Sequence, residues 1–156
     1  MTLKERIHAD MKSAMKAGDR TRVSVLRMVS AKVLEKEVEL RRQKGRDYQL
    51  NDQEVIEVTA AYAKQRRQSI ESYRQAGRED LMAQEEAELE ILKKYLPRQL
   101  SADEIETLVD AAIAESGATD PKEMGKVMKV LMPRLKGAAD GKTVNAVVKR
   151  KLSGET

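Results

Sequence analysis

The stretch YLPRQLSADE, residues 95–104, separates two helical patterns and decides how the chain is divided. Pro97 follows the first pattern, and a proline stops a helix because it lacks an amide hydrogen and clashes with the preceding turn. The Ser-x-x-Glu pattern at residues 101–104 is a capping box, which starts a new helix. We therefore predict an amino-terminal domain at residues 1–97 and a carboxy-terminal domain at residues 98–156.

Four helices are predicted before this boundary from their start and stop signals. Thr2 with Glu5, and Asn51 with Glu54, fit the capping-box pattern, in which two side chains bond to free amide hydrogens of the first turn. Asp19 is a further N-cap candidate, and a glycine or a proline follows each helical pattern. The second and third helices are long, and we expect them to form an extended antiparallel hairpin. The four predicted helices cover residues 2–18, 19–45, 51–77 and 79–96.

Three shorter helices are predicted after the boundary. Asp120 precedes Pro121, and a proline suits the first helical position because the amide hydrogen that it lacks would have no partner there. Asp140 is the N-cap candidate of the last helix. The fold class predicted is all-α, with a four-helix amino-terminal part and a small three-helix tail. The three tail helices are expected at residues 101–117, 120–137 and 140–152.

The composition also favours packed helices. The 156 residues include no Phe or Trp, four Tyr, three Pro and eight Gly, so the core must come from aliphatic residues and turn residues are scarce. Cysteine is absent, which excludes disulfides and thiolate metal sites and is compatible with a reducing compartment. No apolar run reaches the roughly 20 residues that cross a bilayer. We expect a cytoplasmic protein with no secretory signal and no membrane partner.

Charge is distributed unevenly within the predicted tail. The net charge of the whole chain is only +4. Residues 101–123 hold seven acids and one base, whereas residues 124–156 hold eight bases and two acids. A cluster of bases suits a polyanion, because affinity then comes from the release of several counterions at once. The absence of most aromatic residues argues against single-strand stacking and favours a reader of shape and phosphates in structured RNA.

Each of the last two predicted helices has an apolar face with basic residues beside it. We expect the lysines and Arg150 to contact phosphates as charges, and Asn145 to bond near a ribose or a base edge. Rows of solvated lysines are also common on helices that bind nothing, so a purely structural role is the alternative. The predicted RNA-binding residues are Lys126, Lys129, Lys136, Lys142, Asn145, Lys149 and Arg150.

The remaining motifs do not form an active site. The segment DGKT, residues 140–143, resembles part of a phosphate-binding loop, but the spacing from Gly137 to Gly141 is one residue short and no strand precedes it. His8 is the only histidine and has no cysteine as a partner. The acidic run at residues 85–90 lies on a straight helix, which spreads its carboxylates instead of converging them on a cation. We predict no catalytic residue, no metal site and no cofactor.

A second basic stretch lies at residues 64–74 in the third predicted helix. Its arginines have acids close by in the sequence. We expect Arg66, Arg67 and Arg74 to form ion pairs with those acids and not to make a functional site.

Three segments resemble a known family. The segment GKVMKVLMPRLKGAADGKTVNAVVKRKL, residues 125–152, is similar to the tail domain shared by the YqeY-like proteins and the B subunit of the tRNA-dependent amidotransferases. The segments KQRRQSIESYRQAGREDL at 64–81 and EEAELEILKKYLPRQLS at 85–101 resemble the YqeY-like proteins themselves. In that family a basic residue is expected where this chain has Ala138, and Lys136 and Lys142 are placed to supply its charge.

The resemblance implies an all-helical protein whose tail binds tRNA, with no counterpart of the amidotransferase's ATP-dependent activation domain or amidase subunit. The hypothesis for this chain is accordingly a tRNA-binding or structured-RNA-binding accessory protein. A first alternative is an adaptor whose long amino-terminal hairpin docks a protein partner. A second is an amidotransferase-related subunit, of the carbon–nitrogen ligase class that uses glutamine as amido donor, without an autonomous active site.

Overall fold

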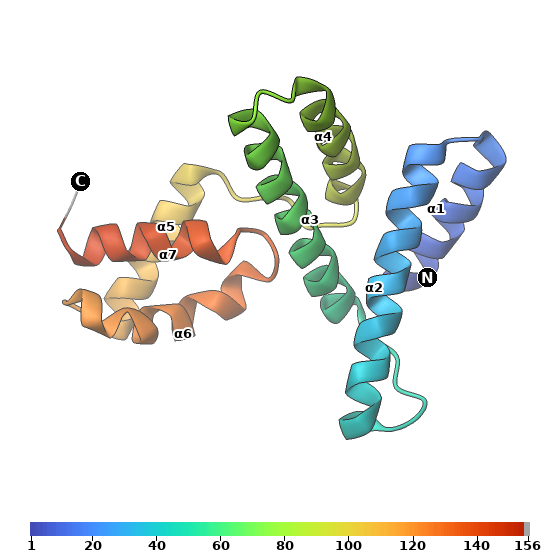
Figure 1. Cartoon of the computed structure of the whole chain (residues 1–156). Helices are drawn as coiled ribbons and strands as arrows, with labels where there is room; N and C mark the ends of the chain where they lie inside the picture. The colour runs from blue at the N-terminus through green and yellow to red at the C-terminus, as the bar shows by residue number, and fades with distance from the viewer. Residues whose placement is uncertain (155–156) are drawn as a thin grey trace. The chain divides into compact units, whose positions relative to one another are not determined.

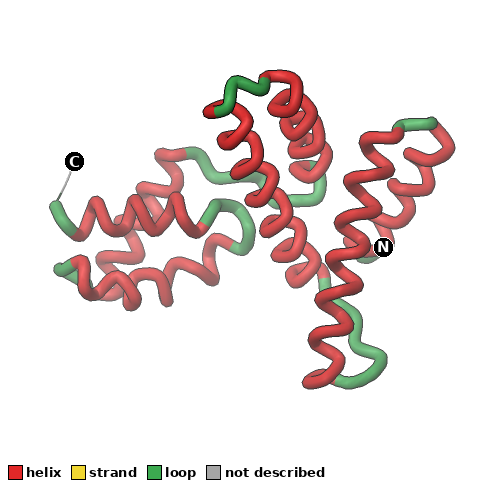
Figure 2. Tube along the Cα trace, in the orientation of Figure 1, coloured by secondary structure: helices red, strands yellow, loops and turns green. Residues whose placement is uncertain are grey.

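Every regular element in the computed structural model is a helix, and the structure describes residues 1–154 (Figure 2). This confirms the predicted all-α fold. The chain divides into two compact units, Met1–Pro97 and Arg98–Thr156. The helices are α1 (Leu3–Ala17), α2 (Arg20–Lys44), α3 (Asp52–Gln75), α4 (Glu79–Lys93), α5 (Ala102–Ser116), α6 (Met124–Leu135) and α7 (Gly141–Leu152), with a 3₁₀ turn η1 (Pro121–Glu123) before α6.

The predicted capping boxes start three of these helices. In α1 the Thr2 hydroxyl accepts a hydrogen bond from the Glu5 amide, and the Glu5 carboxylate accepts one from the Thr2 amide. The same reciprocal pair is formed at the starts of α3 and α5. Asp19 caps α2 through the amide of Arg22. These local bonds satisfy amide hydrogens that a helix leaves unpaired, which is why the sequence predicts helix starts well.

Two helix boundaries differ from the sequence prediction. The fourth helix ends at Lys93 and not at Leu96, and a turn closed by the Tyr95 amide on the Leu92 carbonyl follows it. The residue before a proline is forced out of the helical region, so the chain must leave the helix before Pro97. Residues 121–123 form a 3₁₀ turn before α6 begins.

The amino-terminal unit consists of two helix pairs. α2 packs chiefly against α1, and α3 packs chiefly against α4 (Figure 1). Glycines in the left-handed conformation, Gly18 and Gly77, end the first helix of each pair and allow a tight reversal. α2 and α3 are joined by the loop at residues 45–51, but neither is the main neighbour of the other. The long hairpin of α2 and α3 expected from the sequence is therefore packed less extensively than the two pairs joined by tight turns. A tight turn holds its two helices together along more of their length.

The carboxy-terminal unit consists of α5, α6 and α7 packed on one another around a small aliphatic core. That core contains Val109, Val127, Leu131, Val144 and Val148, all fully buried. None of the helices within residues 1–154 combines the length and the apolar content needed to cross a bilayer.

Candidate nucleic-acid interface

Helix α6 has a buried apolar face and an exposed basic face. Val127, Leu131 and Leu135 are buried at steps of four residues, as the sequence pattern predicts. Lys126 and Lys129 are both exposed, and their three-residue spacing places them as neighbours on the side of the helix that faces away from this core. The sequence thus folds so that the helix covers its core with one side and presents two ammonium groups with the other.

Lys136 lies in the turn between α6 and α7. It is exposed and has the left-handed backbone conformation, with φ of 41°, which costs a residue with a side chain roughly 1 kcal/mol. The turn is held in place by the chain just after the unit boundary: the Leu100 amide donates to the Ala138 carbonyl at 2.9 Å, and the Gln99 side-chain amide donates to the Gly137 carbonyl at 3.0 Å. These bonds fix the turn that carries Lys136.

Helix α7 carries three of the predicted residues on one flank. Lys142, Asn145 and Lys149 are exposed and follow one another at steps of three and four residues, beside the buried row that includes Val144 and Val148. The helix is capped by the Asp140 carboxylate, which accepts a hydrogen bond from the Lys142 amide at 3.4 Å. The cap uses only the backbone amide of Lys142, and the Lys142 side chain forms no ion pair within residues 1–154.

Two of the predicted residues have acidic partners inside the unit. Lys126 forms an ion pair with Glu123 at 3.0 Å, and this hydrogen bond is the main cause that lowers the pKa of the Glu123 carboxyl. Arg150 on α7 forms an ion pair with Glu106 on α5. Part of the charge of both residues is therefore compensated within the protein.

The other four predicted lysines have no ion pair or hydrogen bond from their ammonium groups within residues 1–154. They lie on α6, in the following turn and on α7, and all are exposed. Among the neighbouring bases, Arg134 pairs with Glu115 and Lys151 with Asp110, so these two acids of α5 are occupied by residues other than the four lysines. Among the predicted RNA-binding residues, the lysines without an ion pair within residues 1–154 are Lys129, Lys136, Lys142 and Lys149.

The sequence prediction missed these cross-helix ion pairs. Glu106 and Asp110 are four residues apart and therefore share a face of α5, which was a signal for paired partners on a packed helix. The segregation of acids on α5 and bases on α6 and α7 is explained in part by pairing between the helices.

The other groups singled out from the sequence do not assemble into a catalytic or metal site. His8 is exposed on α1. Arg66 pairs with Glu85 at 2.7 Å and with Glu88 at 3.2 Å, and Arg74 pairs with Glu71 at 2.8 Å, as predicted for this stretch. No ion pair of Arg67 is found in the described part of the chain. Within residues 1–154 no group of three or more His, Asp or Glu side chains is placed to hold a metal ion.

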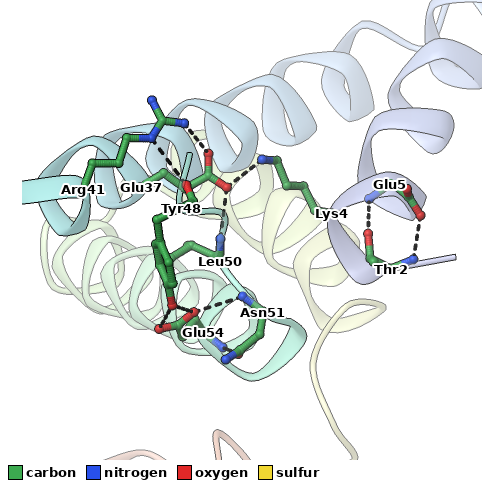
Figure 3. Close-up of polar contacts among 9 residues, drawn as sticks. All are labelled: Thr2, Lys4, Glu5, Glu37, Arg41, Tyr48, Leu50, Asn51 and Glu54. Carbon is green, nitrogen blue, oxygen red and sulfur yellow. Dashed lines mark hydrogen bonds and ion pairs between the residues drawn. The ribbon is translucent and has the colours of Figure 1, made fainter. Parts of the chain in front are cut away.

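A network of polar side chains organises the loop between α2 and α3 (Figure 3). Glu37 is 1% exposed, and its carboxylate accepts hydrogen bonds from the Lys4 ammonium at 2.6 Å and the Leu50 amide at 3.1 Å, with Arg41 at 3.6 Å. All of its partners belong to the protein's own framework. The buried carboxylate therefore ties α1, α2 and the loop together.

Nearly the whole chain is similar to one family of proteins. The profile of the family described as Yqey-like protein matches residues 4–152. The protein named "Altered inheritance of mitochondria protein 41, mitochondrial" is 30% identical in Eremothecium gossypii over 112 residues, which cover 70% of this chain and 58% of that protein. The same-named protein of Saccharomyces cerevisiae is 28% identical over 71% of this chain and 60% of its own length. That of Pyrenophora tritici-repentis is 28% identical over 86% of this chain and 71% of its own length.

Proposed function

The chain belongs to the Yqey-like protein family, and from this premise we propose that its carboxy-terminal unit binds structured RNA, with tRNA as the first RNA to test. One observation carries the proposal. Four exposed lysines on α6, α7 and the turn between them have no acidic partner in residues 1–154, while Glu106, Asp110 and Glu115 of α5 pair with other bases. The resemblance of this unit to the tail of an amidotransferase subunit makes tRNA the natural candidate.

The chemistry of these residues suits phosphates. Lysine ammonium groups on flexible stems act as charges without a fixed hydrogen-bond geometry, so they follow a phosphate backbone and do not read bases. Residues 98–156 contain no aromatic residue, which leaves nothing to stack on unpaired bases. Asn145 on the same flank of α7 as Lys142 and Lys149 would add a polar contact to a ribose or a base edge.

The proposal is for an accessory protein without its own catalytic centre, in which RNA binding is the activity. The relatives are named mitochondrial, whereas a cytoplasmic location is predicted here for this chain. Both compartments contain tRNA, so the proposed binding does not depend on which one applies.

The test is the salt dependence of binding to total tRNA, measured by fluorescence anisotropy at several salt concentrations. Each phosphate contact contributes roughly 0.7 to 0.9 to the slope of log affinity against log salt. Changing Lys129, Lys136, Lys142 and Lys149 together to Gln should weaken binding and reduce that slope by about 3. Because all four side chains are exposed, we expect the variant to remain folded.

A matched control separates local contacts from net charge. The quadruple variant Lys12→Gln, Lys16→Gln, Lys36→Gln and Lys93→Gln removes the same charge from exposed or half-exposed positions of the amino-terminal unit. It should keep nearly the whole slope. If the salt-dependence slope falls equally in both variants, RNA binding depends only on the overall charge of the protein. If the first variant keeps its slope, the lysines form a solvated surface and the RNA hypothesis for this unit is wrong.

A further inference from the structure

The face of α2 that points away from the protein core carries four exposed apolar residues, with the exposed Glu35 among them. Met28, Leu34 and Val38 are 46%, 54% and 54% exposed, and the exposed Ala31 lies between them in helical register. Ten residues of helix separate the first from the last, so the row is about 15 Å long. Single exposed apolar residues need no explanation, but an aligned row on a helix face indicates a surface that another molecule covers.

The row continues into a hollow between the end of α1 and the first half of α2. The hollow has a volume of about 590 Å³. Two methionines line it, Met15 from α1 and Met28 from α2, together with Val23 and Ala31. Methionine side chains are flexible and polarizable, and they adapt to apolar groups of different shape. The face of α2 therefore offers a cavity for a side chain and a ridge that extends from it.

Three arginines border this apolar row: Arg20 and Arg27 at the hollow and Arg42 beyond Val38. All three are exposed, and none forms an ion pair within residues 1–154. Most other arginines of the chain are engaged, as the pairs of Arg66 and Arg134 illustrate. Protein interfaces are enriched in arginine and methionine and depleted in lysine, which is the composition found here and the opposite of the lysine-rich carboxy-terminal surface.

We propose that this face, formed by the hollow of Met15 and Met28, the row from Met28 to Val38 and the flanking arginines, binds an acidic amphipathic helix of a partner protein. The partner helix would place apolar residues in the hollow and along the row, at steps of three and four residues, and its carboxylates against Arg20, Arg27 and Arg42. The inference does not depend on RNA binding by the carboxy-terminal unit.

Charge and shape favour this occupant over three others. RNA phosphates would use the arginines but would leave the apolar row without a partner. A second copy of the same face would bring arginines against arginines, which like charges oppose. A flat lipid surface would cover the row but would have no group that fills the hollow. An acidic amphipathic helix uses all three features.

The test uses two synthetic helical peptides of about four turns with identical leucine positions, one flanked by glutamates and the other by lysines. The methyl signals of the methionines report the site in a carbon-13 nuclear magnetic resonance titration of the whole chain. The glutamate peptide should shift the signals of Met15 and Met28 and leave Met124 and Met128 unchanged. The lysine peptide should shift none of the four.

Charge reversal then checks the arginines. The double variant Arg20→Glu with Arg27→Glu should bind the glutamate peptide at least about tenfold more weakly. It should gain binding of the lysine peptide. The control variant Arg46→Glu with Arg67→Glu reverses two exposed or half-exposed arginines elsewhere and should keep the preference for glutamate.

Several results would overturn the proposal. One is the absence of shifts at Met15 and Met28 at about 1 mM glutamate peptide, where a complex with a millimolar Kd is half formed. Equal shifts with both peptides would also overturn it. The proposal would also be wrong if another agent shifted the signals of these two methionines. A shift with tRNA would assign the face to RNA, and a shift with anionic phospholipid vesicles would assign it to a lipid surface. A shift on raising the protein concentration would assign it to a second copy of the chain.

Discussion

The two units of this protein use charge in opposite ways. The amino-terminal unit buries it: Glu37 is almost fully buried, and Arg66 with Glu85 and Glu88 forms a partly buried cluster against the ring of Tyr62. The carboxy-terminal unit has an entirely aliphatic set of buried residues within its described part, and its ion pairs lie at the periphery. All four tyrosines of the chain also belong to the amino-terminal unit.

The difference follows from what each unit must hold together. The amino-terminal unit joins two helix pairs through the loop at residues 45–51, and the carboxylate of Glu37 fixes that loop by hydrogen bonds from Lys4 and Leu50. The carboxy-terminal unit has three short helices, and a small apolar core is enough to order them. Its charges are therefore left for the surface, where the four lysines Lys129, Lys136, Lys142 and Lys149 of α6, α7 and the turn between them have no ion pair within residues 1–154.

The largest effect is expected from a charge placed in the aliphatic core. Leu131→Asp removes a fully buried leucine, which by itself costs about 2 to 5 kcal/mol, and buries an unpaired carboxylate. A unit this small is expected to unfold. Hydrogen exchange should show loss of protection in α5, α6 and α7 while α1 to α4 keep theirs. Met132→Asp, at the neighbouring exposed position, is the control and should keep the unit folded.

A smaller but substantial effect is expected at the buried carboxylate. Glu37→Ala leaves the Leu50 amide and Lys4 without their acceptor and should lower the free energy of unfolding by about 2 to 4 kcal/mol. Lys4 and Arg41 are partly exposed and can bind water in its place, which limits the loss. Urea unfolding measures the change, and Glu39→Ala, an exposed glutamate of the same helix, is the control. Equal small losses in both variants would contradict the role given to Glu37.

The smallest effect is expected at the partly buried acidic pair of α4. Burial raises the pKa of the Glu88 carboxyl, and the charge of Glu85 raises it further, against the opposing charge of Arg66. The folded state therefore holds this proton more tightly than the unfolded state. The resulting stabilisation is present in full below the unfolded-state pKa and is lost as the pH rises through the folded-state pKa.

Glu88→Gln removes this titration and the repulsion from Glu85 and keeps an acceptor for Arg66. At neutral pH the free energy of unfolding should change by less than about 1 kcal/mol. The stability of the variant should also depend less on pH, from the ordinary pKa of a glutamate upward. Thermal unfolding at a series of pH values measures both, and Glu86→Gln, at an exposed position of α4, is the control. A loss of several kcal/mol at neutral pH would show that Glu88 is an essential partner of Arg66.

The all-α fold class and nearly all helix starts could be predicted from the sequence, because these depend on interactions within a few residues. Thr2 with Glu5 and Ser101 with Glu104 form their caps from neighbours in the chain, and the buried faces of α6 and α7 follow from apolar spacing. The sequence also identified the lysines that are candidates for phosphate binding, since a lysine off an apolar face is exposed wherever the helix packs.

Local patterns could not predict which charges are paired and which helices are neighbours. Glu37 is 13 residues from Leu50 and 33 residues from Lys4 in the sequence, and Arg150 is 44 residues from Glu106. No local sequence pattern predicts contacts over such separations. The same holds for the hollow of Met15 and Met28, whose methionines come from two helices joined by a tight turn. Long-range pairing depends on how whole helix faces pack. A periodic pattern predicts which face of a helix is buried, but it does not predict which other helix covers that face.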